Sequence, residues 1–451
     1  MPEETLRRIV LFLVIIAWAT PLFAAERKTL SLYSVIDAAL VQDEEYNIVK
    51  QDRDSAVNKI EEALDTFIPT VRASATLNSV DKTRDGYKEL PLYNVPSAKV
   101  RLHQVLFSDS KFAAMSTNEN RAKAQRLVAE VLRSDIISNA SGNYCDVIRY
   151  SRLLRNAEAA NKKIKESSAR FKVKNPVYYD TKPALRNLAE SYTNLADITA
   201  LKDVTSYTLL PYVSVFGTDM TASLEQIFLT DKVNLKILTE RFAERALAES
   251  PELLALDEFI KISRRDILAA KRKFVVPDIS VSGEYTRYFE NSNVDPDFFK
   301  NFDENQWNMS LKLTIPIYDG SKNQSELAER QAELMSYFKR KQQVREYVRD
   351  RMADSIDKAA AAAQSYKHAD AEMIVIEQKI KKLTGTKSYQ EAYNLINIHK
   401  TSQDRLINAE HLMMSALVDV QRAYGRFFFY NANESDRRFM DKLMEELKIS
   451  R

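Results

Sequence analysis

The chain has 451 residues, with 66 Lys and Arg against 63 Asp and Glu, which gives a formal net charge of +3. This balance gives no case for nucleic-acid binding from bulk charge. Only 7 residues are Gly, where average usage would give roughly 30. The scarcity argues against nucleotide-binding folds, which use Gly for tight turns and phosphate contacts. It favours long helices with few interruptions, and hydrophobic residues at 45% are enough to form a core.

The first 24 residues have the pattern of a secretory signal peptide. Two arginines precede the apolar run Ile9–Ala17, and small residues offer a cleavage site at Ala24 or Ala25. The run is shorter than a membrane-spanning helix requires. We therefore expect residues 1–24 to be removed on export; the alternative is an uncleaved anchor helix.

The rest of the chain consists of two similar halves. Phe67-Ile68-Pro69 in the first half corresponds to Val275-Val276-Pro277 in the second, and Ser110-Lys111 corresponds to Ser321-Lys322. Each half is predicted to contain a helix, two strands, a very long helix, a tight turn and a helix. The predicted divisions are 25–210 and 238–430 for the halves, 211–237 for the segment between them, and 431–451 for a charged C-terminal tail. We expect that segment and the tail to pack on the outside of the helices.

Four short segments alternate apolar and polar residues, as strands with one apolar face do. The clearest is Trp307–Ile315, in which every odd position is apolar. The others are 71–78, 279–282 and, less regularly, 98–106. Such strands suit either a soluble sheet or a barrel wall between lipid and water. Four strands do not close a barrel, so a membrane barrel requires several chains.

Two segments of 62 residues, 110–171 and 321–382, contain no Pro, and only the first contains a Gly. As continuous helices each would be about 93 Å long. An apolar stripe steps by three and four residues along the first of them, through Val128, Leu132, Ile136, Ala140, Tyr144, Val147 and Leu154. The flanking helices are predicted at 31–66, 183–210, 251–273 and 387–427. In each half the two flanking helices together match the long one in length, which predicts two short helices end to end beside each long helix.

Residues that support catalysis or metal binding are few and scattered. The one cysteine, Cys145, lies in an apolar helical stretch, where packing is its expected role. The four histidines, His103, His368, His399 and His411, show no close ligand spacing. No Ser-His-Asp order or glycine-rich phosphate loop is present. We therefore expect neither an enzyme nor a cofactor or metal site.

Three segments resemble the TolC-like outer membrane efflux protein family. Lys59–Pro69 is similar to the family's passage from a helix into the first strand, and Ala246–Glu252 to its second-half helix start. Leu313–Gly320 contains a Pro-Ile-Tyr-x-Gly element where the last strand turns into the second long helix. The order, duplication and spacing of these segments carry the resemblance, which covers nearly all of the mature chain.

The resemblance implies a mainly α fold with a small β portion. In this family, three copies of the chain form a twelve-stranded β-barrel in the bacterial outer membrane, continued by a twelve-helix tunnel in the periplasm. The implied function is a channel for efflux or secretion. The implied partners are two further copies of the chain, outer membrane lipid, a periplasmic adaptor protein and an inner-membrane transporter, and not nucleic acid.

The family's gate and docking residues lie in the turns after the long helices, where an acidic residue follows a Gly by six positions. Gly385 and Glu391 have this spacing, and in the first half Lys174 takes the Gly position ahead of Asp180. Lys387 is the nearest cation, and an ion pair with Asp180 of the other hairpin would hold the channel mouth shut. The resemblance thus implies a periplasmic gate of Asp180, Lys387, Glu391 and Asn394. It implies adaptor-docking turns of Val173, Lys174, Asn175, Pro176, Thr384, Gly385 and Thr386.

This chain departs from the family pattern at both turns. Lys174-Asn175-Pro176 replaces Gly and apolar residues, so docking is expected to differ, and Asn394 is uncharged at the family's second acidic position. The alternative for Asp180 and Glu391 is a solvated helix start, where carboxylates favour the helix dipole. The alternative for the whole chain is a non-channel helical scaffold or adhesive rod of the cell envelope.

Overall fold

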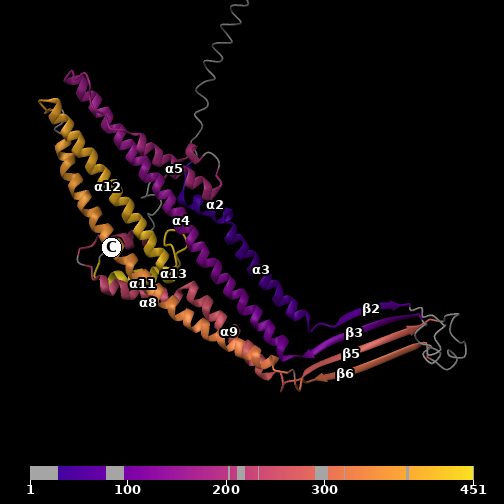
Figure 1. Ribbon diagram of the computed structural model, residues 1–451. Coiled ribbons are helices and arrows are strands. Elements are labelled where there is room, and N and C mark those ends of the chain that lie inside the picture. The colour runs from indigo at the N-terminus through magenta and orange to yellow at the C-terminus, as the bar shows by residue number, and fades with distance from the viewer. Residues whose placement is uncertain are drawn as a thin grey trace, which may run out of the picture. The chain divides into compact units, whose positions relative to one another are not determined.

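The computed structural model describes residues 29–77, 96–201, 204–210, 219–231, 233–289, 303–318, 320–381 and 385–449. The predicted signal peptide lies outside these residues. The described residues form two compact units (Figure 1). Unit 1 takes residues from 1–47, 131–250 and 347–451, and unit 2 takes residues from 48–130 and 251–346. Among the described residues, no helix combines the length and the apolar character needed to cross a bilayer.

Unit 2 contains one antiparallel sheet with strand order β2-β3-β5-β6 (Figure 1). All four predicted strands are confirmed. Their bounds are Thr70–Thr76 for β2, Ser97–Phe107 for β3, Asp278–Tyr288 for β5 and Asn305–Thr314 for β6. Strand β5 runs well beyond its predicted end at residue 282, because Gly283 interrupts the apolar pattern but not the pairing.

The register gives the sheet two chemically different faces. Val71 pairs with Leu102, and Val281 pairs with Leu311, so apolar side chains of neighbouring strands share one face. Among the described residues nothing covers this face, since Trp307 is 80% exposed and Leu311 71% exposed. The opposite face carries most of the polar and charged residues of the same strands.

The two very long helices are confirmed: α4 spans Asp109–Arg170 with 62 residues, and α11 spans Lys322–Ile380 with 59. Each contributes to both units. Of the predicted apolar stripe on α4, Ala140, Tyr144 and Val147 are buried, while the other four are half-buried. Cys145 is buried, as its predicted packing role requires.

The helix predicted over 31–66 is wrong as a single element. It is two helices, α2 (Leu32–Gln42) and α3 (Glu44–Asp65), divided at Asp43. The Asp43 carboxylate accepts a hydrogen bond of 2.7 Å from the Tyr46 amide, so it caps a new helix. Glu44 and Glu45 follow in the first turn of α3, where acids favour the dipole.

The helix predicted over 183–210 is also wrong. Helix α5 spans Lys182–Thr199 and ends at Ala200, which has a left-handed φ of 50°. After it come a 3₁₀ turn, η3 (Val204–Ser206), and a short strand, β4 (Thr208–Leu209), which pairs in parallel with β1 (Thr29–Leu30). In the first half the predicted match in length between flanking and long helices therefore fails, because α5 has 18 residues and not 28.

A buried tyrosine of α4 fixes this strand pair in unit 1. The Tyr144 hydroxyl lies 3.0 Å from both the Leu30 and the Leu210 carbonyl oxygens and accepts from the Leu210 amide at 3.0 Å. Burial raises the pKa of Tyr144, so the hydroxyl stays protonated and can donate.

Three helices of the second half begin or end at recognisable caps. Helix α8 (Leu235–Glu249) begins after Asn234, whose side chain accepts from two backbone amides, and α9 (Pro251–Arg272) begins with Pro at its first position. Helix α12 spans Tyr389–Tyr424, shorter than the predicted 387–427, because Ser388 caps its start and Gly425 ends it.

The segment between the halves and the tail each form a helix. These are α7 (Asp219–Leu229) and α13 (Glu434–Glu446), and they contact each other in unit 1. The fully buried Asp436 fixes the start of α13, because its carboxylate accepts from the Tyr424 hydroxyl at 2.8 Å and from the Asn433 amide at 3.0 Å.

Two glycines provide a matched test of the helix assignments. Gly425 has a φ of 89°, where a Cβ is strained, whereas a Cβ on helical Gly142 would meet no atom within 4 Å. Gly425→Ala should lower the free energy of unfolding by about 1–2 kcal/mol. Gly142→Ala should raise it by about 0.5–1 kcal/mol. Urea unfolding of both variants in detergent measures this, and shifts of the same sign would contradict the assignments.

Candidate gate and channel wall

The turn after α4 ends the helix with a Schellman motif. The Val173 amide donates to the Ser168 carbonyl at 2.9 Å, and the Lys172 amide donates to the Ala169 carbonyl at 3.3 Å. Lys172 holds the left-handed position, with a φ of 54°. A glycine usually occupies such a position. The backbone therefore reverses at Lys172, two residues before Lys174, the residue that takes the Gly position of the family pattern.

The segment that returns from this turn is held by Asn161 of α4. Its side-chain amide donates to the Tyr179 carbonyl at 3.0 Å, and its oxygen accepts from the Tyr179 amide at 2.8 Å. The Tyr179 hydroxyl donates to Asn397 of α12 at 2.7 Å. Burial, with smaller contributions from Tyr393 and Asp404, raises the pKa of Tyr179 to about 12, so this donor persists at neutral pH.

The turn after α11 is described from Gly385 onward, and Thr384 lies outside the described residues. The Ser388 hydroxyl accepts from the Glu391 amide at 3.2 Å, and a Glu391 carboxylate oxygen accepts from the Lys387 amide at 2.9 Å. This reciprocal arrangement resembles a capping box and fixes the start of α12.

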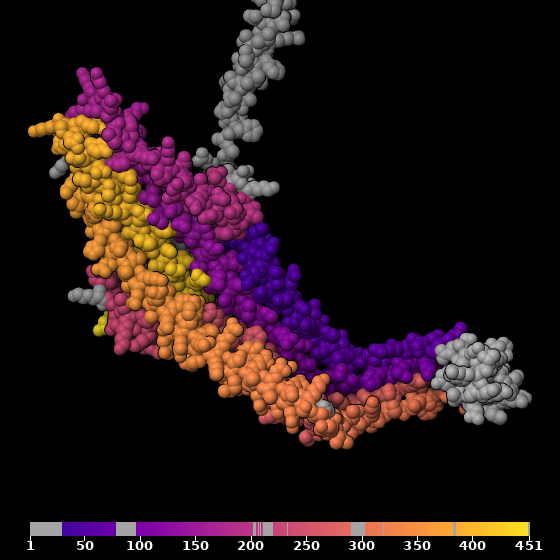
Figure 2. Space-filling model, viewed as in Figure 1, coloured from indigo at the N-terminus to yellow at the C-terminus, as the bar shows by residue number. Residues whose placement is uncertain are grey.

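A contact of Arg170 joins the two turns. The Arg170 guanidinium donates to the Thr386 carbonyl at 3.1 Å and lies over the Phe171 ring. Figure 2 shows the two turns as separate tips at the same end of unit 1, one magenta and one yellow. The tips are therefore linked at their base within one chain.

Of the predicted gate residues, Asp180 and Lys387 lie in the turns, and Glu391 and Asn394 lie in the first turns of α12. Asp180 accepts from the Lys182 amide at 2.9 Å, and Asn394 accepts from the Gln390 side chain at 3.1 Å. Within the described part of a single chain, no ion pair joins Asp180 to Lys387. The gate therefore stays a prediction for the assembled protein. Sequence reasoning missed Asn161, Arg170 and Tyr179, whose partners are distant in the sequence.

Polar side chains join α4 to α12 below the turns. Four contacts repeat about one helical turn apart: Asp146–His411 at 3.4 Å, Arg149–Asn408 at 2.8 Å, Arg152–Glu410 at 2.6 Å and Asn156–Asp404 at 2.8 Å. Burial lowers the pKa of His411, and the nearby Arg149 lowers it further against the opposing effect of Asp146. These contacts hold the helices that carry the two turns.

The polar face of the sheet in unit 2 forms a hollow of about 650 Å³. Each of the four strands contributes residues to it, and its charged side chains are Arg72, Lys99, Arg101, Glu284 and Lys312. The Arg101 Nε donates to Glu284 at 2.8 Å, and the Lys99 ammonium lies 3.6 Å from the same carboxylate. The hollow is thus lined mainly by cations.

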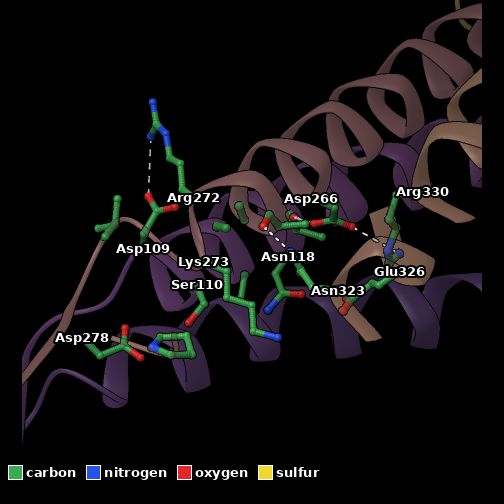
Figure 3. Close-up of a pocket in the computed structure, with 17 residues that line it drawn as sticks. Asp109, Ser110, Asn118, Asp266, Arg272, Lys273, Asp278, Asn323, Glu326 and Arg330 are labelled. Atoms are coloured by element: carbon green, nitrogen blue, oxygen red, sulfur yellow. Dashed lines mark hydrogen bonds and ion pairs between the residues drawn. The ribbon is translucent and has the colours of Figure 1, made fainter. Parts of the chain in front are cut away.

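A second hollow, of about 450 Å³, lies in unit 2 where α4, α9, α11 and β5 meet (Figure 3). Two ion pairs cross it: Arg272 lies 3.7 Å from Asp109, and Arg330 lies 3.5 Å from Asp266, which also accepts from Thr117 at 3.0 Å. These pairs join the helices, which suits a structural junction better than a binding site.

Comparison with known proteins agrees with this architecture, although no family model matches the chain. Outer membrane protein TolC of Escherichia coli strain K12 is 23% identical over 429 residues, which cover 89% of this chain and 84% of TolC. The chain is a homologue of TolC over most of the length of both proteins. Its predicted resemblance to the TolC-like family is thereby confirmed.

Solved structures of other bacterial membrane proteins show the same fold. The Campylobacter jejuni CmeC outer membrane channel gives a TM-score of 0.60 at 14% identity, covering 92% of this chain and 89% of CmeC. The open state of the Neisseria gonorrhoeae MtrE outer membrane channel gives 0.61 at 14% identity, covering 88% and 89%. A membrane protein from Pseudomonas aeruginosa gives 0.62 at 16% identity, covering 87% and 93%. The predicted fold class is confirmed.

The role of Asn161 in holding the return segment can be tested directly. Asn161→Ala removes two hydrogen bonds to the Tyr179 backbone and should lower the free energy of local opening by about 1–3 kcal/mol. Amide exchange over residues 172–181 should then be faster by a factor of roughly 5 to 150. Asn143→Ala, which removes only exposed bonds within α4, is the matched control. Equal exchange in both variants would show that Asn161 does not hold this segment.

Proposed function

We propose that this chain is one protomer of a trimeric outer membrane channel, which passes solutes from the periplasm to the cell exterior. The observation that carries the proposal is the sheet of unit 2. One face of it is apolar and uncovered, with Trp307 80% exposed and Met309 71% exposed, and the other face is polar and charged.

The open edges of this sheet support the trimer. Strands β2 and β6 each pair on one side only, so each leaves a row of backbone donors and acceptors without ladder partners in the single chain. In a bilayer these backbone donors and acceptors need hydrogen-bond partners from other strands, which they obtain when the sheet closes into a barrel. Three copies of a four-stranded sheet form a closed barrel of twelve strands, with the apolar faces toward lipid.

The long helices supply the rest of the duct. Helix α4 follows β3 directly and α11 follows β6, so each hairpin of the sheet leads into a helix of about 90 Å. In a trimer these helices form the wall of a periplasmic tunnel. The relatives CmeC and MtrE are outer membrane channels, and channel function without catalysis is proposed for this chain.

We further propose that the two helix turns form the gate and the docking surface for a periplasmic adaptor and its inner-membrane transporter. Asp180 precedes α5 by two residues, and Glu391 lies in the first turn of α12. In a trimer they would place six carboxylates around the mouth, where a narrow pore limits screening by salt. The docking residues are Val173, Lys174, Asn175, Pro176, Thr384, Gly385 and Thr386, and the gate also includes Lys387 and Asn394.

Closure between protomers predicts a specific cross-link. Ser74 of β2 and the β6 residues Asn308, Ser310 and Lys312 share the polar face at opposite edges of the sheet. Ser74→Cys combined in turn with Cys at each β6 position should give a disulfide-linked trimer for at least one pair. Lys99→Cys on central strand β3, combined with the same β6 substitutions, is the control and should give none. A protein that is monomeric in detergent, with no cross-link from any pair, would contradict the barrel.

The gate predicts changes in ion selectivity. In planar bilayers the wild-type trimer should conduct. The double variant Asp180→Ala with Glu391→Ala should have a reversal potential that indicates lower selectivity for cations. Lys387→Glu should raise the open probability if Lys387 pairs with Asp180 across hairpins; one exposed pair contributes only about 0–1 kcal/mol, so three copies are needed.

Glu434→Ala with Glu445→Ala removes the same charge from exposed positions on α13 and should change neither property. Conducting variants with unchanged selectivity and open probability would leave Asp180 and Glu391 as helix-start charges only. A folded wild-type protein without conductance would favour the envelope scaffold instead of the channel.

A further inference from the structure

The charges on the polar face of the sheet are unevenly balanced. Four Lys and Arg side chains line its hollow against one carboxylate, Glu284. This leaves an excess of three positive charges on each chain. Asp278 begins β5 and lines the junction hollow instead.

Glu284 compensates only part of this set. Its carboxylate is shared by Arg101 and Lys99, on the strand next to it. Arg72 on β2 and Lys312 on β6 form no ion pair with any residue that the structure describes. The uncompensated cations thus belong to the two edge strands, and both are exposed in the single chain.

The register places like charges in direct opposition. Arg72 on β2 pairs with Arg101 on β3, and Arg101 in turn pairs with Glu284 on β5. Like charges directly opposite each other on neighbouring strands destabilise a sheet. Ser or Thr would suit the polar face equally well without this loss of stability. Residues that reduce local stability in this way are typical of functional positions.

The junction hollow of the same unit provides a contrast. There each carboxylate from α4 and α9 has a cation beside it, as in the Asp109–Arg272 and Asp266–Arg330 pairs (Figure 3). The junction hollow therefore shows no comparable excess of cations, since its carboxylates outnumber its Lys and Arg side chains.

We propose that the polar face of β2, β3, β5 and β6 is a binding wall for small polyvalent anions, such as solutes bearing several phosphate or carboxylate groups. This inference rests on the proposed function, since a closed trimer turns the face toward the lumen and brings nine excess positive charges together. A low-dielectric wall focuses such a field and raises the local concentration of counter-ions. The wall has the opposite sign to the carboxylates at the helix turns, so anions are held in the strand portion of the duct.

The test uses the purified full-length trimer in planar bilayers, with inorganic tripolyphosphate added to each side in turn. Tripolyphosphate should reduce the current from at least one side. Arg72→Gln with Lys312→Gln should raise the half-blocking concentration at least about tenfold, which corresponds to 1.4 kcal/mol. Glu284→Gln, which removes the one carboxylate that lines the hollow, should lower the half-blocking concentration.

The control is Arg437→Gln with Lys442→Gln, which removes two exposed cations from α13 and should leave the block unchanged. If the wild-type trimer conducts but tripolyphosphate has no effect, or blocks both double variants equally, the anion wall is wrong and the channel stands. A wild-type trimer that does not conduct overturns both. Urea midpoints of the variants verify that the sheet is intact.

Discussion

A sheet with two unlike faces and two open edges is the constraint on which the rest of this protein depends. Four strands are too few to close on themselves. The apolar face carries Trp307, Met309 and Leu311, and no layer of the described residues covers them. In water, a single chain would expose that apolar face to solvent. In a bilayer, it would leave the backbone groups at the edges of β2 and β6 without hydrogen-bond partners. In the proposed function, association of several copies with the apolar faces outward in lipid satisfies both requirements.

The long helices follow from the same arrangement. Helices α4 and α11 are the elements that follow the two strand hairpins in the chain, so in the proposed trimer closure of the sheet also arranges the helices around an axis. The polar contacts between α4 and α12, such as Arg152–Glu410 at 2.6 Å, then fix the helices that carry the turns. Under the proposed function, charges of both signs follow one another along the duct, with carboxylates at the turns and cations on the sheet.

The sequence predicted what depends on local pattern and missed what depends on distant partners. The period-two alternation at 307–315 predicted β6, and the scarcity of Gly and Pro predicted α4 and α11 nearly to their ends. Asp43 was overlooked because apolar periodicity on both sides of it outweighed one capping side chain. The end of α5 was missed because the β1–β4 pairing and the Tyr144 contacts join residues far apart in the chain.

The candidate sites show the same division. The six-residue spacing from the turn position in the sequence correctly placed Asp180 and Glu391 at the starts of helices. The clamp by Asn161, the Arg170–Thr386 link and the sharing of Glu284 by two cations depend on geometry across turns and strands. A polar residue within a helix, such as Asn161 near the end of α4, was an available signal.

The environment of Trp307 tests the barrel most directly. The sequence contains two tryptophans, and the other, Trp18, lies in the predicted signal peptide. In the mature protein, reconstituted in vesicles of brominated lipid, we predict strong quenching of the Trp307 fluorescence and little effect of aqueous acrylamide, with Trp307→Phe as the blank. Quenching by acrylamide but not by brominated lipid would place this face in water and contradict a lipid-facing barrel wall.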